Sequence, residues 1–180
     1  NVIEKEVTQG MRFDKGYKSP YFVTDPVKME AVVDNPYILV TDQKISAVSD
    51  VVGIIESVAK SGKKDLVIIA DDIDGEALTT FVLNKIRGTF NIYAVQAPSF
   101  GDNKKLILED ISILVGADFI KSDIGKQLKD ITLDQLGTAS KVIISKDNTT
   151  IVGGNGDKEQ IERHAKQIRN LIEQSKSEYD

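Results

Sequence analysis

The feature that most constrains the fold is a strand–helix–strand succession at the centre of the chain. Asp65–Ala70, DLVIIA, is a continuous apolar run rich in β-branched residues, which is typical of a strand buried on both faces. Asp74–Gly88 predicts a short helix, with Asp74 at the N-cap and Gly88 just past the end. Asn91–Val95, NIYAV, follows as a second strand. This order predicts a right-handed βαβ unit with a parallel strand pair.

The helix of this unit carries more apolar surface than one buried face requires. At about 100° per residue its apolar side chains spread over an arc of roughly 240°, whereas a surface helix buries a face little more than about 100° wide. These side chains are Ala77, Leu78, Phe81, Val82, Leu83 and Ile86. Part of the helix therefore either lies deep in the core or presents apolar side chains to a partner.

A second helix, Asp50–Ser61, shows the same excess. Ser49 or Asp50 can cap it. Its apolar side chains cover an arc of roughly 160°. This arc divides into a face that suits the core and an edge that extends beyond that face. The core face consists of Val51, Ile54 and Val58, and the edge consists of Val52, Ile55 and Ala59.

Two such helices side by side would form a groove for an extended or helical peptide. A partner that fully buries one of the outer side chains would gain roughly 1.5–3 kcal/mol from it. Such contacts are non-directional, so the groove would accept many sequences. The alternative is that all of these residues fill one ordinary core, and the pattern leaves both possibilities open.

The remaining segments predict one α/β domain with mixed strands that spans residues 1–180. Residues 1–30 have no strand or helix period and predict a loop-rich segment. The further strands are Met29–Val33, Tyr37–Val40, Lys44–Val48 (or a helix approach), Asp118–Ile120, Lys141–Ser145 and Thr149–Val152, with a turn at Asp34–Pro36 and a hairpin turn at Lys146–Asn148. The further helices are Lys104–Val115 and the long, charged Asp157–Glu178.

Composition excludes several classes of function. Net charge is −5 with both signs interspersed, so no basic stripe for nucleic acid is present. The chain has no cysteine and only one histidine, His164, which excludes disulfides and cysteine zinc sites and disfavours a histidine triad. The longest apolar run, Leu66–Ala70, is too short to cross a bilayer. Without an initiating methionine or a leader, the chain is expected to be a soluble piece of a longer protein.

Two polar features are candidates for chemistry. Carboxylates follow the buried strand at its carboxyl end, where α/β proteins often bind ligands and where Mg²⁺ could be held. They are Asp71, Asp72, Asp74 and Glu76, and the alternative is that they only favour the start of the next helix, since no lysine constellation is evidently paired with them. The glycine-rich stretch 153–156 matches neither phosphate-binding motif and predicts a plain turn.

Five blocks of the sequence, in order, resemble the apical domain of GroEL-type (group I) chaperonins. The blocks are GMRFDKGYKSPYF, KISAVSDVVGIIESVAKSGK, IIADDIDGEALTTFVLNKIRG, APSFGDNKK and ISKDNTTIV. The resemblance implies a three-layer β/β/α fold with mixed strands, two groove helices and a long C-terminal helix. It also implies a module that binds non-native polypeptides, and a GroES-type co-chaperonin through its mobile loop, in a hydrophobic groove between two helices.

The resemblance assigns the site by matching positions. The predicted binding residues are Tyr17, Ser19, Tyr21 and Phe22 of an aromatic loop, Val52 and Ile55 of the first helix, and Leu78, Val82, Leu83 and Asn84 of the second. Ala77 and Phe81 should face the core, and Ile86 is undecided. From pattern alone, the aromatic side chains of the loop could equally fill the core. The sequence departs from the family in three ways. Lys18 stands where an apolar residue is frequent, Gly53 stands where proline is frequent, and the first groove helix carries Val and Ile where leucine is common.

The family's nucleotide-binding loop and catalytic aspartate belong to an equatorial domain that this sequence does not contain. The resemblance therefore implies that this chain catalyses nothing and binds no cofactor, whereas the parent chaperonin uses ATP and Mg²⁺. It implies a monomeric piece of a ring-forming parent, most simply from the bacterial cytoplasm. Neither nucleic acid nor a membrane is expected as a partner.

Overall fold

The computed structural model describes residues 10–88, 90–97, 101–120 and 131–154. Its strands are β1 Met11–Phe13, β2 Ala31–Asp34, β3 Tyr37–Val40, β4 Lys44–Ile45, β5 Asp65–Ala70, β6 Asp72–Ile73, β7 Asn91–Gln96, β8 Gly137–Ile144 and β9 Thr149–Gly154. Its helices are α2 Val52–Lys60, α3 Gly75–Arg87 and α4 Gly101–Val115, with short 3₁₀ turns η1 Pro20–Phe22, η2 Val48–Asp50 and η5 Leu133–Gln135. The predicted helix Asp157–Glu178 and His164 lie outside the described residues.

The predicted βαβ unit is confirmed. β5 and β7 pair in parallel from Asp65↔Asn91 to Ala70↔Gln96, and α3 connects them. β3 adds to the other edge of β5, also in parallel, with Tyr37↔Leu66. The middle strand is buried on both faces, which explains its unbroken run of apolar residues.

The antiparallel strands continue the same sheet. Its order is β1–β9–β8–β3–β5–β7, with β2 also paired to β8, and β4 and β6 form a separate two-stranded sheet. β8 is long enough to pair with two strands along one edge. Thr138 near its start pairs with Tyr37 of β3, and Ile144 at its end pairs with Ala31 of β2. The α/β class with mixed strands is therefore confirmed.

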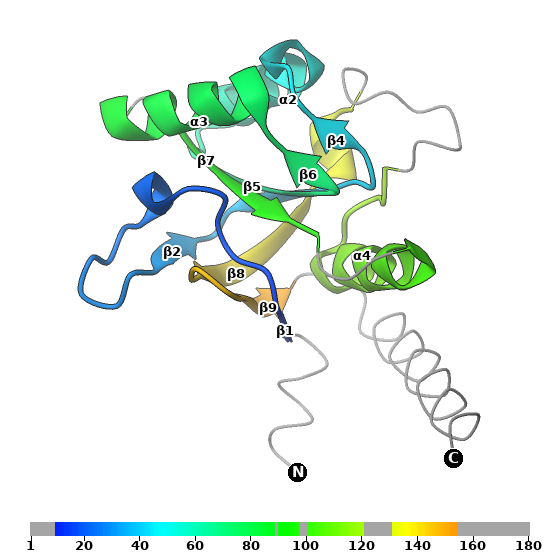
Figure 1. Cartoon of the computed structure of the whole chain (residues 1–180). Helices are drawn as coiled ribbons and strands as arrows, with labels where there is room; N and C mark the ends of the chain where they lie inside the picture. The colour runs from blue at the N-terminus through cyan, green and yellow to red at the C-terminus, as the bar shows by residue number, and fades with distance from the viewer. Residues whose placement is uncertain (1–9, 89, 98–100, 121–130, 155–180) are drawn as a thin grey trace.

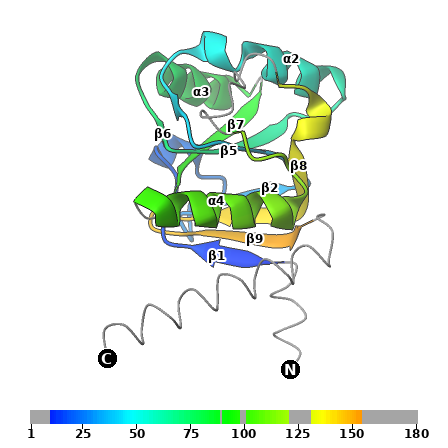
Figure 2. The same ribbon diagram turned by 90° about the vertical axis from the view of Figure 1, so that its right-hand side faces the viewer.

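The elements form three layers (Figures 1 and 2). Helices α2 and α3 cover one face of the parallel strands, and α4 lies on the other face together with the antiparallel strands. α4 contacts both β3 and β8. None of the described helices combines the length and apolar character needed to cross a membrane.

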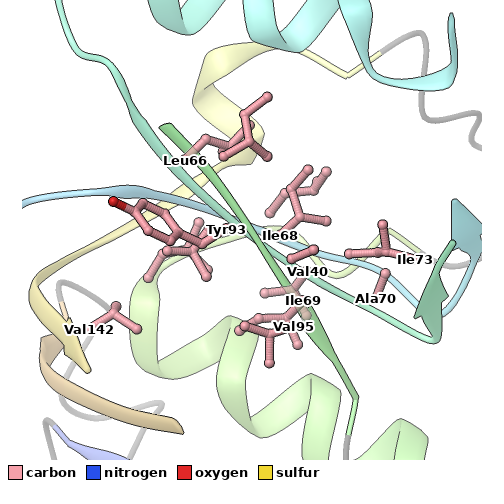
Figure 3. Close-up of a cluster of buried hydrophobic side chains, with 14 of the residues drawn as sticks. Val40, Leu66, Ile68, Ile69, Ala70, Ile73, Tyr93, Val95 and Val142 are labelled. Atoms are coloured by element: carbon pink, nitrogen blue, oxygen red, sulfur yellow. The ribbon is translucent and has the colours of Figure 1, made fainter. Parts of the chain in front are cut away.

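The core lies between these layers and is built mainly from the parallel strands (Figure 3). Its labelled side chains are Val40, Leu66, Ile68, Ile69, Ala70, Ile73, Tyr93, Val95 and Val142, all of them buried. These side chains come from β3, β5, β6, β7 and β8, so the core forms only when strands distant in sequence pack together.

Several predicted boundaries were wrong. β2 begins two residues later than expected, and β8 begins at Gly137 because its first residues pair with β3. β1 lies in the segment expected to be irregular and exists because Met11 pairs with Ile151. The strand expected at Asp118–Ile120 is a single bridge between Thr41 and Ile120. Such pairings depend on distant strands, so local pattern does not reveal them.

Candidate functional site

The two faces of α3 are separated as predicted. Ala77 and Phe81 are fully buried against the sheet. On the opposite side Leu83 is 43% exposed, while Leu78 and Val82 are half-buried at the edge of the core. Ile86, which the sequence left undecided, is 61% exposed. It lies four residues after Val82, so it extends the outer apolar stripe by one further turn.

The faces of α2 are separated in the same way. Val51, Ile54 and Val58 are buried, whereas Val52 is 44% exposed and Ile55 is half-buried. The predicted cap is wrong: Ser49 and Asp50 belong to η2, and Val51 occupies the N-cap without a side-chain hydrogen bond. The helix is thus positioned by its buried face.

The outer layer of the domain thus carries apolar side chains that are not fully buried on both helices, and we name this set the apolar surface of α2 and α3. It consists of Val52 and Ile55 of α2 and Leu78, Val82, Leu83 and Ile86 of α3. Both helices lie on the same face of the parallel strands, the face opposite α4 (Figure 1). Asn84 is half-buried on α3, and its carbonyl accepts a hydrogen bond from the Gly88 amide at the helix end.

The aromatic segment, Tyr17–Phe22, packs against α3 through η1. Ser19 is the N-cap of η1, and its Oγ accepts a hydrogen bond from the Tyr21 amide at 3.2 Å. Tyr21 is 65% exposed. Tyr17 is half-buried, bridges to Val95 at the edge of β7, and donates its hydroxyl to the Met29 carbonyl at 3.2 Å. The structure therefore brings the segment to the helix that it was predicted to assist.

Phe22 differs from the prediction. Its ring is fully buried and packs against Tyr93, with the ring centroids 6.0 Å apart and the planes tilted by 54°. Lys85 of α3 lies over the other aromatic ring, 5.6 Å from the Tyr93 centroid, and burial raises the pKa of that phenol. A fully buried ring offers no surface to a bound chain, so Phe22 supports the aromatic segment from beneath.

The acidic cluster is divided among separate partners. Lys18 Nζ lies 2.8 Å from Asp72 Oδ1, and Lys104 pairs with Asp71. The Val48 amide donates to Glu76 at 3.1 Å. The structure thus supplies lysine partners that were not evident from the sequence.

Asp74 occupies the N-cap of α3 as predicted, but its carboxylate makes no capping hydrogen bond. Ser46 Oγ donates to it at 2.6 Å, and Lys44 Nζ lies 3.1 Å away. The hydrogen bond from Ser46, followed by that from Lys44, lowers the pKa of Asp74, and the same contact with Asp74 raises the pKa of Lys44. Asp74 thus links α3 to the segment around β4.

These contacts do not favour the magnesium alternative. Three of the four carboxylates are neutralised by lysines from different parts of the chain. Within the described ranges no three acidic or histidine side chains converge on one point where a metal could sit. The glycine-rich stretch lies only partly within the structure: Gly153 and Gly154 end β9, and Asn155 and Gly156 are outside the described residues.

A polar recess of about 310 Å³ lies beside the aromatic segment. It is lined by Asp14, Lys15, Gly16, Tyr17, Lys18, Gln96, Lys146 and Asp147. Charges of both signs surround it, so it differs in character from the apolar surface of α2 and α3.

The sequence contained signals for part of what was missed. Ile86 could have been assigned from its i+4 spacing to Val82. The lysine partners of the acids come from positions far apart in the chain, and no local pattern points to them.

The family model of the TCP-1/cpn60 chaperonins matches residues 1–172 of this 180-residue chain. The match includes the aromatic segment, both helices of the apolar surface and all of the described strands. The chain therefore belongs to the TCP-1/cpn60 chaperonin family, and its role is that of a chaperone in protein folding.

Proposed function

We propose that this chain is the apical, substrate-binding domain of a group I (GroEL-type) chaperonin. It binds non-native polypeptides through the apolar surface of α2 and α3, with the aromatic segment at one margin. The mobile loop of a GroES-type co-chaperonin occupies the same surface. The support for this proposal is the chaperonin family membership together with the residues that the two helices leave exposed.

The observation that carries the proposal is that the excess apolar residues of both helices are on the outside. Val52 and Leu83 expose 44% and 43% of their surface, and Ile86 exposes 61%. Leaving such side chains in water forgoes roughly 1.5–3 kcal/mol for each one that could be fully buried. A folding chaperone must bind many sequences, and an apolar surface without directional contacts has that property.

The remaining functions of the parent protein would lie in parts that this chain lacks. We propose that the chain itself binds no ATP, holds no metal and catalyses no reaction. ATP hydrolysis and ring assembly would belong to an equatorial domain of the parent. The setting that we propose is the bacterial cytoplasm.

Two valines of equal exposure provide a matched test of the surface. Val52 on α2 and Val152 on β9 expose 44% and 45% of their surface, and they lie in different layers of the domain. Binding of reduced, carboxymethylated α-lactalbumin, a permanently unfolded chain, would be measured by titration. We expect Val52→Ser to weaken binding about tenfold, equivalent to about 1.4 kcal/mol, and Val152→Ser to leave it unchanged.

The two side chains at the centre of α3 should matter more. We expect Leu78→Ser and Val82→Ser to abolish measurable binding while circular dichroism shows the domain still folded. Equal loss from Val52→Ser and Val152→Ser would contradict the assigned surface, as would unchanged binding by both α3 variants.

A further inference from the structure

Lys18 belongs to the aromatic segment, and two of its contacts reach other elements of the domain. Its amide donates to the Ala94 carbonyl of β7 at 3.0 Å, which places its backbone at the edge of the parallel strands. Its side chain extends from there to β6, where Nζ lies 2.8 Å from Asp72 Oδ1. Lys18 thus joins the aromatic segment to a strand in the layer that carries the helices.

The position of Asp72, the partner of Lys18, is fixed by several contacts of its own. Its Oδ1 also accepts a hydrogen bond from the Ile73 amide at 2.8 Å. Its backbone is in register with Lys44 of β4, and Ile73 beside it is fully buried. The strand continues directly into Asp74, the N-cap of α3. A contact with Asp72 is therefore a contact with the base of α3.

The ion pair is more enclosed than its neighbour. The side chains of Lys18 and Asp72 are 24% and 28% exposed, against 54% and 41% for Lys44 and Asp74. Enclosure reduces screening by solvent and salt, so this pair should be stronger than an average surface pair. Within the described ranges it is the only ion pair from residues 14–22.

The segment also packs against α3 through η1, but within the described ranges its hydrogen bonds to other elements do not involve α3. Tyr17 is attached to Ser145 by its amide and to Met29 by its hydroxyl. The hydrogen bond between Ser19 and Tyr21 is internal to η1. Phe22 anchors the far end in the core. Between these two anchors, Lys18 supplies the charged contact toward α3.

We propose that the Lys18–Asp72 ion pair fastens the aromatic segment to the base of α3, and that Lys18 is thereby a positioning residue for polypeptide binding. It holds Ser19 and Tyr21 at a set distance from Leu78 and Val82, so that both sides of the surface engage a bound chain together. The positioning role rests on the proposed function, whereas the fastening does not.

The test compares three variants in two measurements. Lys18→Met removes the charge and keeps the length of the side chain, Lys18→Arg keeps the charge, and Lys28→Met removes an exposed lysine of the same loop that makes no ion pair in the described part of the chain. Amide hydrogen exchange at Tyr17 and Lys18 measures the fastening. Titration with reduced, carboxymethylated α-lactalbumin measures the positioning.

We expect Lys18→Met to speed exchange of the Lys18 amide about fivefold, the factor that corresponds to an ion pair of about 1 kcal/mol. Its affinity for the unfolded chain should fall about threefold, and the global midpoint of urea unfolding should stay close to that of Lys28→Met. Lys18→Arg should restore both exchange and affinity. Lys28→Met should match the wild type.

The failures of the two proposals are distinguishable. Unchanged exchange in Lys18→Met would overturn the fastening, whatever the affinity. Faster exchange with unchanged affinity would overturn the positioning role. If the wild type does not bind the unfolded chain at all, the proposed function and the positioning role both fall, and the exchange data alone decide whether the ion pair fastens the segment.

Discussion

Gly16 is the residue that lets the aromatic segment approach the β8–β9 hairpin. A Cβ atom at this position would lie 1.8 Å from the Ser145 carbonyl oxygen and 2.4 Å from that of Lys146. The close approach allows the Tyr17 amide to donate to the Ser145 carbonyl at 3.1 Å. The glycine therefore determines where the segment enters the surface.

We expect Gly16→Ala to lower the free energy of unfolding by about 1–3 kcal/mol, because backbone atoms must move to relieve the overlap. Urea unfolding measures this change. Gly62→Ala is the control, since Gly62 has a φ of 92° but nothing within 4 Å of a built Cβ. Unchanged stability of Gly16→Ala relative to the wild type would contradict a steric requirement for glycine at this position.

A residue from another part of the chain can also change what a local pattern means. The acids around Asp74 suggested either a metal site or a helix cap. Their carboxylates are instead bound by Lys18, Lys44 and Lys104, and by Ser46. Each partner reaches the cluster only when β4, α4 and the aromatic segment are all in place, so its role could not be read from the acids themselves.

Among the elements, α3 separates stability from binding most clearly. Phe81 is fully buried and Ile86, on the same helix, is 61% exposed. We expect Phe81→Ala to lower the free energy of unfolding by about 3–5 kcal/mol, because it leaves a cavity in the core. Ile86→Ser should change that free energy by no more than about 0.5 kcal/mol.

The affinity for an unfolded polypeptide should be reduced by the substitution that leaves stability unchanged, and not by the one that lowers it. Under conditions in which both variants are folded, Ile86→Ser should weaken binding of the unfolded polypeptide and Phe81→Ala should not. Denaturant unfolding measures the stability of each variant, and titration of the same samples with the unfolded polypeptide measures its affinity. A large loss of stability in Ile86→Ser would show that the outer stripe belongs to the core.

The start of α3 predicts a pH dependence. The pKa of Asp74 is lowered from its ordinary value of 3.8, so the carboxylate stabilises the fold above that value and loses this contribution as the pH falls through the folded-state pKa. We expect the urea midpoint of the wild type to fall more steeply below about pH 4 than that of Asp74→Asn. The pKa of Lys44 is raised, so this lysine matters at high pH instead. Its contribution to the stability of the fold is present below pH 10.5 and is lost as the pH rises through the folded-state pKa.

Added salt provides the control for this comparison. Both side chains of the Lys44–Asp74 pair are about half exposed, so salt should reduce the difference between wild type and Asp74→Asn. Parallel acid profiles of the two proteins at low salt would contradict a role for Asp74 in stability.

At the scale of the whole molecule, the proposed binding site combines the apolar surface of α2 and α3 with the aromatic segment, which is far from the helices in sequence. The aromatic segment comes from the first part of the chain, α2 and α3 from its middle, and the strands beneath them from several regions (Figure 2). Outside the apolar surface and the aromatic segment, the large exposed apolar side chains of the described residues are few: Val27, Met29 and Val152. Stable association of two copies usually needs about 800 Å² from each, which scattered residues do not supply.

We therefore expect the chain to sediment as a monomer of 19.8 kDa. Addition of ATP and Mg²⁺ should change neither its mass nor its unfolding midpoint. A species of twice this mass would show that copies associate. If Val52→Ser then restored the monomer and Val152→Ser did not, the apolar surface of α2 and α3 would be the interface between copies.

The sequence by itself determined the elements whose signals are local. The run from Leu66 to Ala70 is apolar because that strand is covered on both faces, and the spacing of apolar residues divided α2 into a core face and an edge correctly. For α3 the spacing showed only an excess of apolar residues, and the resemblance assigned its two sides. Resemblance in five blocks of sequence then selected the chaperonin family, which the family match bears out.

The tertiary structure decided what depends on distant neighbours. It placed β1 and the first half of β8 by strand pairing, buried Phe22 against Tyr93, and divided the acids among lysines that no local pattern connects to them. The physical reason is the same in each case: pairing, burial and charge neutralisation are properties of the surroundings of a residue, and only the folded chain brings those surroundings together.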